Sequence, residues 1–335
     1  MINNIQISKQ NEKLKLTLLD KKLLYELDID ARQPLTVLSK KVRASPAVIQ
    51  YRMKRMEDAG FIKNYISFLD AGKLGLMIWN VYLQLQNTAE KEEKEIIQYL
   101  SEQKKTWWVS RCSGKWNLIY SICVKDVREF YNFVTNVNNK YGKYIFEQSI
   151  AAHAEVEIIS RGYFLNKSGK GKTWYKNIEQ PNLDETDIKI LRQLSSKARM
   201  PSTEIAEKTH LTARVVSYRI KELLHRGIIH RFRLHLDTKK IGMSFYKVII
   251  YVKEYTDLKN AGLKEYCINQ GNIFHYEQKI GPWMLELELD AENYESADKQ
   301  LKDMKEVFHD FIRSYELILI TEEPKGELDL TKQIE

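Results

Sequence analysis

Two short segments of the sequence carry side chains whose types and spacing suit contacts with nucleic acid. "YRMKRMEDAGFI" at 51–62 returns as "YRIKELLHRGII" at 218–229, with the same Tyr-Arg start and the same Lys at the fourth place. Cationic side chains along one helix can contact phosphates, which is chemistry of binding rather than of bond breaking. We therefore expect double-stranded DNA as the partner, and we predict no catalytic residue, cofactor or metal ion.

The residues of the first copy that could contact bases lie at the start of this helix. A recognition helix presents side chains near its N-terminus to base edges in the major groove. With Val48 and Met53 facing the interior, Ala47, Gln50 and Tyr51 should face outward. Gln50 suits a bidentate contact with adenine.

In the second copy the same three positions hold Arg214, Ser217 and Tyr218, and Arg214 suits guanine. Because the two reading helices differ, we expect a binding site with unlike half-sites. The predicted DNA-contacting residues are Thr36, Ser45, Ala47, Gln50, Tyr51, Arg52, Lys54 and Arg55 in the first copy, and Thr203, Thr212, Arg214, Ser217, Tyr218, Arg219, Lys221, Arg231 and Arg233 in the second.

The stretch that follows each helix differs in charge between the copies. "HRGIIHRFRLH" in the second copy holds Arg226, Arg231 and Arg233, whereas the matching first-copy stretch has only Lys63. We therefore predict that the second copy supplies more of the nonspecific, salt-sensitive affinity. Its three histidines are expected on a solvated basic wing, because no carboxylate or cysteine joins them at metal-ligand spacing.

Structural roles are the alternative for several of these residues. Arg52 and Arg219 could instead brace the first helix of their own copy. Tyr51 and Tyr218 could pack on the surface of the domain rather than touch DNA.

The similarity between the two segments extends over most of the chain. A constant offset of 167 positions relates Asp20 to Asp187, and the same offset relates the glycine at 60 to that at 227 and the Gly-x-Trp turn at 114–116 to that at 281–283. The chain is therefore two copies of one unit. Between the copies, "NKSGKGKTWYKNIEQP" at 166–181 is rich in Gly, Lys and Asn, which indicates a polar linker.

The first part of each copy has the period of short helices. In the first copy a stripe of leucines at spacings of three and four predicts an amphipathic helix that ends before Pro34. Thr36 and Thr203 are then expected to cap a second helix, and Ser45 and Thr212 a third, which ends near a glycine. Three short helices with a tight turn between the last two are typical of a helix-turn-helix.

The second part of each copy changes to the pattern β-α-β-β-α-β, which is the ferredoxin-like arrangement. In the strand after each Gly-x-Trp turn, apolar residues alternate from Trp116 and from Trp283, and we expect this face to lie beneath the helices. The predicted fold is thus α+β, with two tandem units. The predicted domains are winged helix-turn-helix at 14–75 and 182–242, ferredoxin-like at 76–165 and 243–323, and the linker at 166–181.

The bulk composition is that of a globular chain. Of the 335 residues, 43% are hydrophobic and 29% charged, and the net charge of +8 permits an anionic partner. No apolar run approaches the roughly 18 residues that span a bilayer, and the N-terminus lacks a secretory h-region, so we expect no membrane partner and a cytoplasmic location. Three widely spaced cysteines indicate buried thiols rather than a disulfide framework.

At this point the sequence resembles a known family. "LSKKVRASPAVIQYRMKRMEDAGFIKNY", the following "LDAGKLG" and the second module with its Gly-x-aromatic turn are similar to Lrp/AsnC transcriptional regulators, and the second copy resembles them equally. The resemblance covers nearly all of 14–322. It implies a winged helix that binds DNA, joined to an effector-binding and oligomerisation domain.

The resemblance also implies a small-molecule effector such as an amino acid, held near the Gly-x-aromatic turn. The corresponding residues here are Gly114, Trp116, Asn117, Gly281 and Trp283. The turn departs from the family's usual Gly-x-Tyr/Phe-Asp, because its last position is Asn in one copy and Met in the other. The two second modules are expected to pair within the chain as a pseudo-dimer or between chains as a homo-oligomer.

Two other functions compete with a regulator. Siroheme decarboxylases resemble the same units, and such an enzyme needs cationic and imidazole groups around a tetrapyrrole, of which His275, Lys279 and Trp283 give a trace. A protein-interaction module that no longer touches DNA is the other. The basic recognition helices favour a sequence-specific DNA-binding regulator.

Overall fold

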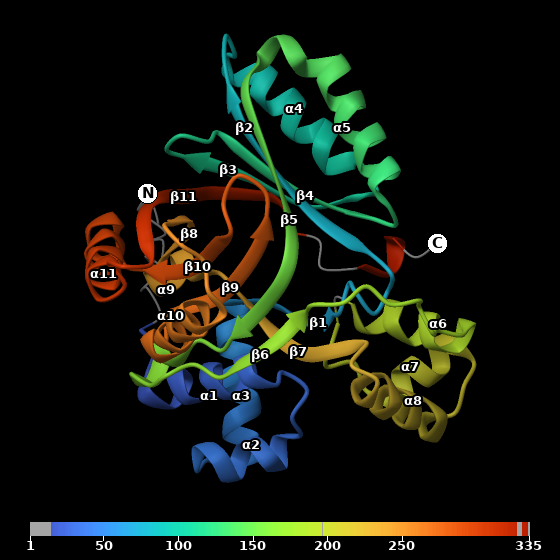
Figure 1. The fold of residues 1–335 in the computed structure, drawn as a ribbon. Coiled ribbons are helices and arrows are strands. Elements are labelled where there is room, and N and C mark those ends of the chain that lie inside the picture. Colours follow the sequence, from blue (N-terminus) through green and yellow to red (C-terminus); the bar gives the residue numbers. More distant parts are fainter. Residues whose placement is uncertain (1–14, 196, 327–329, 334–335) are drawn as a thin grey trace, which may run out of the picture.

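The computed structural model describes residues 15–195, 197–326 and 330–333, and it places two helical units beside one large sheet (Figure 1). Residue 14, where the first domain was predicted to begin, lies outside the described residues. In each unit three helices precede a strand, as predicted. These elements are α1 (Leu18–Ile29), α2 (Leu35–Val42), α3 (Pro46–Asp58) and β1 (Ile62–Leu69), then α6 (Glu185–Leu194), α7 (Ser202–Thr209), α8 (Ala213–His225), β7 (Ile229–Leu236) and the short α9 (Thr238–Ile241).

The remaining elements form two β-α-β-β-α-β modules, which confirms the predicted α+β fold. The first contains β2 (Met77–Leu85), α4 (Glu90–Glu102), β3 (Thr106–Ser113), β4 (Leu118–Val124), α5 (Val127–Tyr141), a 3₁₀ turn (Gly142–Tyr144) and β5 (Ile145–Ile159). The second contains β8 (Ser244–Val252), α10 (Asp257–Gln270), β9 (Ile273–Ile280), β10 (Leu285–Ala291), α11 (Tyr294–Val307) and β11 (Ile312–Gly326), and a 3₁₀ turn (Leu330–Gln333) follows. Both final strands are long, with 15 residues each, and each extends across to pair with a strand of the other module.

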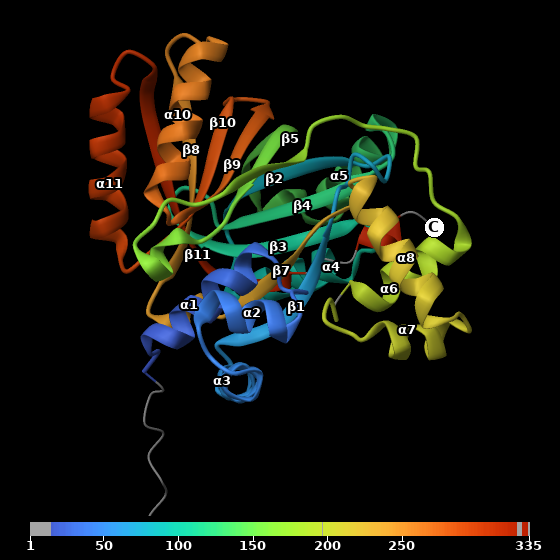
Figure 2. The same ribbon diagram turned by 90° about the horizontal axis from the view of Figure 1, so that it is seen from below.

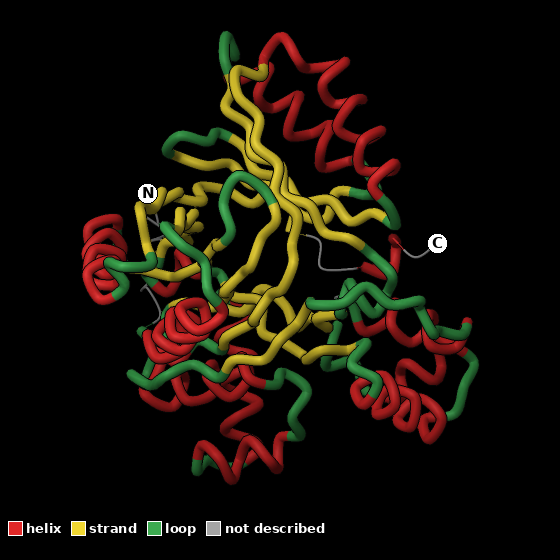
Figure 3. The backbone as a smooth tube through the Cα atoms, viewed as in Figure 1, coloured by secondary structure: helices red, strands yellow, loops and turns green. Residues whose placement is uncertain are grey.

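The two modules join edge to edge within the chain. The strands follow the order β2-β4-β3-β11-β8-β10-β9-β5, and β2 also pairs with β5, so that these eight strands close on themselves. The junctions between modules are antiparallel: Cys112 of β3 lies opposite Ile320 of β11, and Val156 of β5 lies opposite Glu277 of β9. Of the two arrangements that the sequence left open, the structure shows pairing within one chain. Figure 3 shows this sheet between the peripheral helices.

The helices pack on the outer face of the closed sheet. Leu118, Tyr120 and Ile122 of β4 form one core with α4 and α5, as the alternation predicts. Trp116 and Trp283 were expected on that face, but they pack inside the closed sheet around Tyr82. The alternation does not reach them, because β4 begins only at Leu118 and β10 only at Leu285.

The strands predicted as wings pair with each other. β1 and β7 form an antiparallel ribbon in which Tyr65 lies opposite Leu234, so each helical unit contributes one strand. Each strand also packs into the other unit: Phe68 of β1 joins the core of the second unit, and Leu234 of β7 joins that of the first. The two helical units therefore share their cores and do not fold as separate bodies.

The polar segment at 166–181 contains a strand, contrary to the prediction of a simple linker. After a 3₁₀ turn at Gly162–Leu165, β6 (Gly171–Tyr175) pairs with β5. Trp174 and Tyr175 are buried, and the Trp174 indole donates a 2.6 Å hydrogen bond to the Leu69 carbonyl. The aromatic pair within the polar composition was the signal for this strand.

The helix starts agree with the prediction at two positions and disagree at two. Ser45 and Thr212 cap α3 and α8, each accepting a hydrogen bond from the backbone N–H three residues on. Thr36 and Thr203 cap nothing, because α2 and α7 already begin after Pro34 and Pro201. Among the described residues, no helix is both long and apolar enough to cross a membrane.

One core position of each third helix differs from the prediction, whereas Met53 is buried as predicted. Ile49 and Val216 are buried, whereas Val48 and Val215, which were expected inside, are about two-fifths exposed, at 41% and 39%. An α-helix turns 100° per residue, so the residue after each valine faces the core while the valine lies toward solvent.

Two arginines from equivalent positions are exchanged between the helical units. Arg32 donates to the carbonyls of Ala198 and Met200, the latter at 2.9 Å, and Arg199 donates to those of Ala31 and Gln33, the latter at 3.2 Å. Each guanidinium also lies over an aromatic ring of the β1–β7 ribbon. The repeated Ala-Arg pair of the sequence thus ties each unit to the other, and Figure 2 shows the two units side by side.

We predict that Arg32→Ala and Arg199→Ala each lower the free energy of unfolding by about 1–3 kcal/mol, because each leaves two carbonyl oxygens of the other unit without their donor. Urea denaturation followed by tryptophan fluorescence measures the change. Lys40→Ala, at an exposed position of α2, is the control and should change it by less than about 0.5 kcal/mol. Three equally small effects would show that the exchange does not hold the units together.

Candidate functional site

The outer faces of α3 and α8 carry most of the residues predicted to contact DNA. Gln50, Tyr51 and Lys54 are exposed on α3, and the tyrosine has 64% of its surface free. On α8, Arg214, Tyr218 and Lys221 are exposed and Ser217 is half-buried. Ala47 and the threonines at 36 and 203 are also exposed. These faces are open to a partner, and the individual base contacts stay predictions.

Arg52 and Arg219 lie against the first helix of their own unit. Arg52 is 3.4 Å from the buried carboxylate of Asp20, and Arg219 is 3.4 Å from that of Asp187. The Asp187 carboxylate also forms an ion pair with Arg226, at 3.1 Å. Both arginines therefore brace the first helix of their own unit in the structure, which is the alternative to phosphate contact given above.

The basic wing predicted for the second copy is not a solvated surface. Arg233 is 4% exposed, and its guanidinium contacts Asp28, His275 and the Ile159 carbonyl at 3.1–3.3 Å. His230 is also buried, and Arg231 is half-buried. Pairing of β7 with β1 turns this strand inward, which the sequence pattern did not reveal. Arg233 is therefore not available to DNA, and the expected excess of salt-sensitive affinity in the second copy loses its basis.

The residues predicted to hold an effector have structural partners. Trp116 and Trp283 are buried around Tyr82, with ring centroids 5.7 and 4.9 Å from it. The Asn117 side-chain oxygen, expected to meet a ligand, accepts a 2.7 Å hydrogen bond from the Leu85 backbone. Gly114 and Gly281 lie in the turns beside them. None of these five residues lines the main cavity of the protein, which lies elsewhere.

A cavity of about 160 Å³ lies elsewhere, between the β1–β7 ribbon and the interior of the closed sheet. It is lined by strands of both modules and by both strands of the ribbon, so every part of the fold contributes to it. Its aromatic walls are Phe68, Trp107, Trp108, Trp174, Phe245 and Phe274. Its polar lining includes three histidines and several buried charges, which form a connected network.

Lys247 of β8 is the centre of this network. Its ammonium, 1% exposed, lies 2.9 Å from Glu286, 2.9 Å from Glu288 and 3.4 Å from Glu277. Tyr82 donates a 2.6 Å hydrogen bond to Glu286. A buried ammonium shared by three carboxylates is stable only with such complete pairing.

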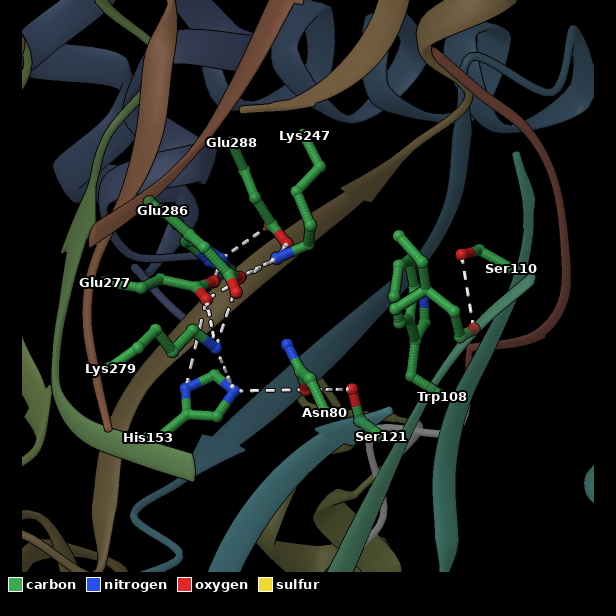
Figure 4. A network of polar contacts seen from close by, with 12 residues as sticks. Asn80, Trp108, Ser110, Ser121, His153, Lys247, Glu277, Lys279, Glu286 and Glu288 are labelled. Carbon is green, nitrogen blue, oxygen red and sulfur yellow. Dashed lines mark hydrogen bonds and ion pairs between the residues drawn. The ribbon is translucent and has the colours of Figure 1, made fainter. Parts of the chain in front are cut away.

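A second lysine extends the network to the first module, as Figure 4 shows. Lys279 of β9 is 2.7 Å from Glu277 and 3.2 Å from Glu286, and it donates to His153 Nε2 of β5 at 2.7 Å. Next to His153, the Asn80 side-chain oxygen accepts a 2.6 Å hydrogen bond from Ser121. The network thus crosses the junction between the two modules.

A further set of charges connects the cavity to the first helical unit. Asp28 at the end of α1 is fully buried, and it accepts from the Arg161 backbone at 2.7 Å and from the side chains of Arg161 and Arg233 at 3.3 Å. Arg161 in turn lies 2.7 Å from Asp290 of β10, which lines the cavity. A change at Asp290 can therefore reach α1 through a single arginine.

The protonation states follow from burial and from these neighbours. Burial alone would raise the pKa of Asp28 and of Glu288, but the guanidinium of Arg233 and the ammonium of Lys247, respectively, lower it below the usual value. The carboxylates raise the pKa of Lys247 despite its burial. Burial and the Lys279 ammonium lower the pKa of His153 well below its usual value, so this imidazole is neutral at pH 7.

Three polar atoms of the lining lack a hydrogen-bond partner within the described structure. They are Oδ1 of Asp290, Nδ1 of His153 and Nε1 of Trp107, and the side chains of Asp290 and His153 are at least nine-tenths buried. Buried polar atoms in native proteins are usually paired with protein, water or ligand. These three atoms mark the places where a bound molecule would find hydrogen-bonding groups.

The cavity also holds three side chains that could coordinate a metal ion. The nearest ligand atoms of His275, Glu277 and Glu288 lie within 4.8 Å of one another. Both carboxylates already pair with Lys247, so a cation at this place would have to displace the ammonium. The arrangement therefore favours an internal ion-pair network over a metal centre.

We predict that Lys247→Met destabilises the protein by about 3–5 kcal/mol at pH 7, because three buried carboxylates lose their shared cation. The loss should shrink as the pH falls toward 5, since buried carboxylates that lose a neighbouring cation have raised pKa values and bind protons in the folded state. The parent should show the opposite slope near pH 4, where Asp28 and Glu288, with lowered pKa values, lose their contribution to stability.

Urea unfolding at a series of pH values measures both slopes. Lys302→Met is the matched control, because Lys302 is 70% exposed and pairs with one carboxylate at 2.6 Å on the surface. It should cost no more than about 1 kcal/mol. A Lys247→Met variant with the stability of this control would contradict the role given to the network.

Comparison with known proteins places the two units in a family. A model described as winged helix-turn-helix DNA-binding matches residues 16–63 and 183–230. The chain is 36% identical over 69 residues to the HTH-type transcriptional regulator LrpB of Bacillus subtilis, a match that covers 21% of this chain and 46% of LrpB. It is 31% identical over 130 residues to an uncharacterised HTH-type transcriptional regulator of Pyrococcus abyssi, which covers 38% of this chain and 82% of that protein.

One solved structure is similar over almost the whole chain. It is the siroheme decarboxylase NirDL, with a TM-score of 0.62, 12% identity and coverage of 95% of this chain and 98% of that one. At this identity the similarity shows a common fold. The sequence matches, which include four-fifths of the Pyrococcus regulator, show that the chain belongs to the Lrp/AsnC family of winged helix-turn-helix DNA-binding transcriptional regulators.

Proposed function

We propose that the protein is a sequence-specific DNA-binding regulator in which one chain supplies both DNA-reading units. The observation that carries this proposal is that the arginine exchange and the β1–β7 ribbon fix two complete helix-turn-helix units in one body, while α3 and α8 keep their outer faces exposed. Family members that assemble as dimers present two such units from two chains; here a pseudo-dimer would do so from one.

The two reading faces would recognise unlike half-sites. Gln50 on α3 corresponds to Ser217 on α8, and the exposed Ala47 corresponds to the exposed Arg214. A glutamine favours adenine and an arginine favours guanine, so the two halves of a site would not mirror each other. A DNA partner also agrees with the cytoplasmic location expected from the sequence.

We also propose that the regulator responds to a small molecule, and that this ligand is an amino acid. The cavity, rather than the Gly-x-Trp turns, would hold it. Its volume of about 160 Å³ is below the roughly 300–1,000 Å³ of sites for drug-sized ligands, so it suits a small molecule. An ammonium group could meet the unpartnered Oδ1 of Asp290, and binding there would disturb the Asp290–Arg161–Asp28 connection to α1.

A tetrapyrrole enzyme of the siroheme decarboxylase type is the second candidate. The shared fold and the presence of His153, His275, Arg161 and Arg233 around the cavity favour it. Two features oppose it. Four carboxylates also line the cavity, and its volume suits a smaller molecule than a tetrapyrrole. A Soret shift on adding iron-uroporphyrin to a protein that retards no DNA would favour the enzyme.

We predict that Arg214→Ala weakens binding to the preferred site by about 1–3 kcal/mol and relaxes base preference in one half-site only. Gln50→Ala should relax the other half-site. In vitro selection on random duplexes, followed by fluorescence anisotropy at fixed salt, measures both effects. Lys91→Ala on α4, exposed and distant in sequence from both units, is the control and should bind as the parent does.

A strictly palindromic selected site bound by one chain would contradict the proposal of unlike half-sites. Loss of preference at the same base positions in both variants would contradict the assignment of one reading face to each half-site.

A further inference from the structure

A second hollow lies between the two helical units, apart from the cavity described above. It has a volume of about 710 Å³ and is bounded by the turn after α1, by β6, by α8 and by the start of β7. Part of its lining is apolar, with Ile29, Ile220 and Phe232. We call it the inter-unit cleft.

The charges of the inter-unit cleft have one sign almost throughout. Arg32, Lys170, Lys172, Lys221 and Arg231 line it, against one carboxylate, Asp30. Within the described residues, none of the three lysines nor Arg231 forms an ion pair: Lys172 donates to the His230 carbonyl at 2.8 Å, and Arg231 to the Ile158 carbonyl at 3.4 Å. Unpaired cations held close together repel one another, and a bound anion would relieve that repulsion.

A buried histidine at the floor of the cleft points independently to a ligand. His230 is 4% exposed, lines the cleft, and neither ring nitrogen has a hydrogen-bond partner of good geometry, although the Thr173 backbone lies beside the ring. A neutral imidazole has one N–H to donate. A buried donor without a well-aligned acceptor is a group that a ligand oxygen would satisfy.

Local pKa values agree with an uncompensated positive field. Burial, then Arg231 and Lys172, lower the pKa of His230 to about 2, and burial and Arg233 lower that of Arg231 to about 10. The pKa of Lys172 is also lowered, first by burial and then by Arg231.

The matching place in the first unit is not cationic in this way. The positions equivalent to His230 and Leu224 hold Lys63 and Glu57, and the Glu57 carboxylate accepts a 2.6 Å hydrogen bond from Tyr65. The cleft is therefore a feature of one side of the molecule, whereas the helix-turn-helix itself is repeated on both.

The geometry points to the inter-unit cleft as a binding site for a small phosphate-bearing molecule with two or more negative charges. Its phosphate oxygens would contact Lys170, Lys172, Lys221 and Arg231, and its apolar part would lie on the floor near Phe232. A rigid duplex touches the surface and would not reach His230 at the floor, which favours a small molecule over the DNA backbone. Because Arg32 belongs to the first unit and Lys221 to the second, the ligand would bridge the two DNA-reading units.

The test uses the full chain without DNA, with inorganic pyrophosphate and ADP as probes. Isothermal titration at constant ionic strength should show one site, and the His230 imidazole NMR signal should shift on binding. Lys221→Ala, at an exposed position, should weaken binding at least tenfold. Lys54→Ala, the equivalent substitution in the first unit, is the matched control and should leave it unchanged.

Three results would overturn the inference. They are the absence of binding by both probes, equal weakening by Lys221→Ala and Lys54→Ala, or binding without any shift of the His230 signal. If Lys221→Ala weakens only the binding of duplex DNA, the cleft belongs to the DNA interface instead. The titration and the NMR measurement are made without DNA. A negative result there would therefore reject the ligand site without rejecting the regulator proposal.

Discussion

The pairing of the two halves of the chain is the constraint on which the rest of the structure depends. Eight strands from two modules close on themselves, and the β1–β7 ribbon and the Arg32–Arg199 exchange join the two helical units. Because each unit completes the core of the other, neither half has a finished interior alone. Duplication in one chain thus replaces the association of two chains, at a fixed ratio and without dependence on protein concentration.

Duplication also frees the two halves to differ. In a symmetric dimer a buried charge appears twice, whereas here β10 carries Glu286, Glu288 and Asp290 where the equivalent positions of the first module carry Ile119, Ser121 and Cys123. The cavity network and the inter-unit cleft both lie on such unequal surfaces. An internal pseudo-dimer can therefore hold one ligand site of each kind beside two DNA-reading helices.

The local pattern of the sequence predicted the elements well, because helix period, strand alternation and capping residues are local signals. The order β-α-β-β-α-β of each second module is the one that the pattern predicts. One core position of each third helix was wrong, since Val48 and Ile49 are both apolar and period alone does not choose between them.

The candidate site was harder to predict, because its residues meet only through pairing between distant strands. The acids of β10 alternate along the sequence at 286, 288 and 290, but their partner Lys247 and the inward turn of Arg233 depend on the closure of the sheet and on the β1–β7 ribbon. The resemblance to the family predicted an effector site at the Gly-x-Trp turns, whereas in the structure the two tryptophans pack in the interior.

The number of chains on one DNA site tests the central claim most directly. Mass photometry or analytical ultracentrifugation of the protein on its selected duplex gives this number. We expect one chain of 39.6 kDa to occupy both half-sites, and a duplex with one half-site scrambled to bind more weakly at the same stoichiometry. Two chains on each site, with one reading unit of each chain in contact with DNA, would contradict the internal pseudo-dimer as the DNA-binding form.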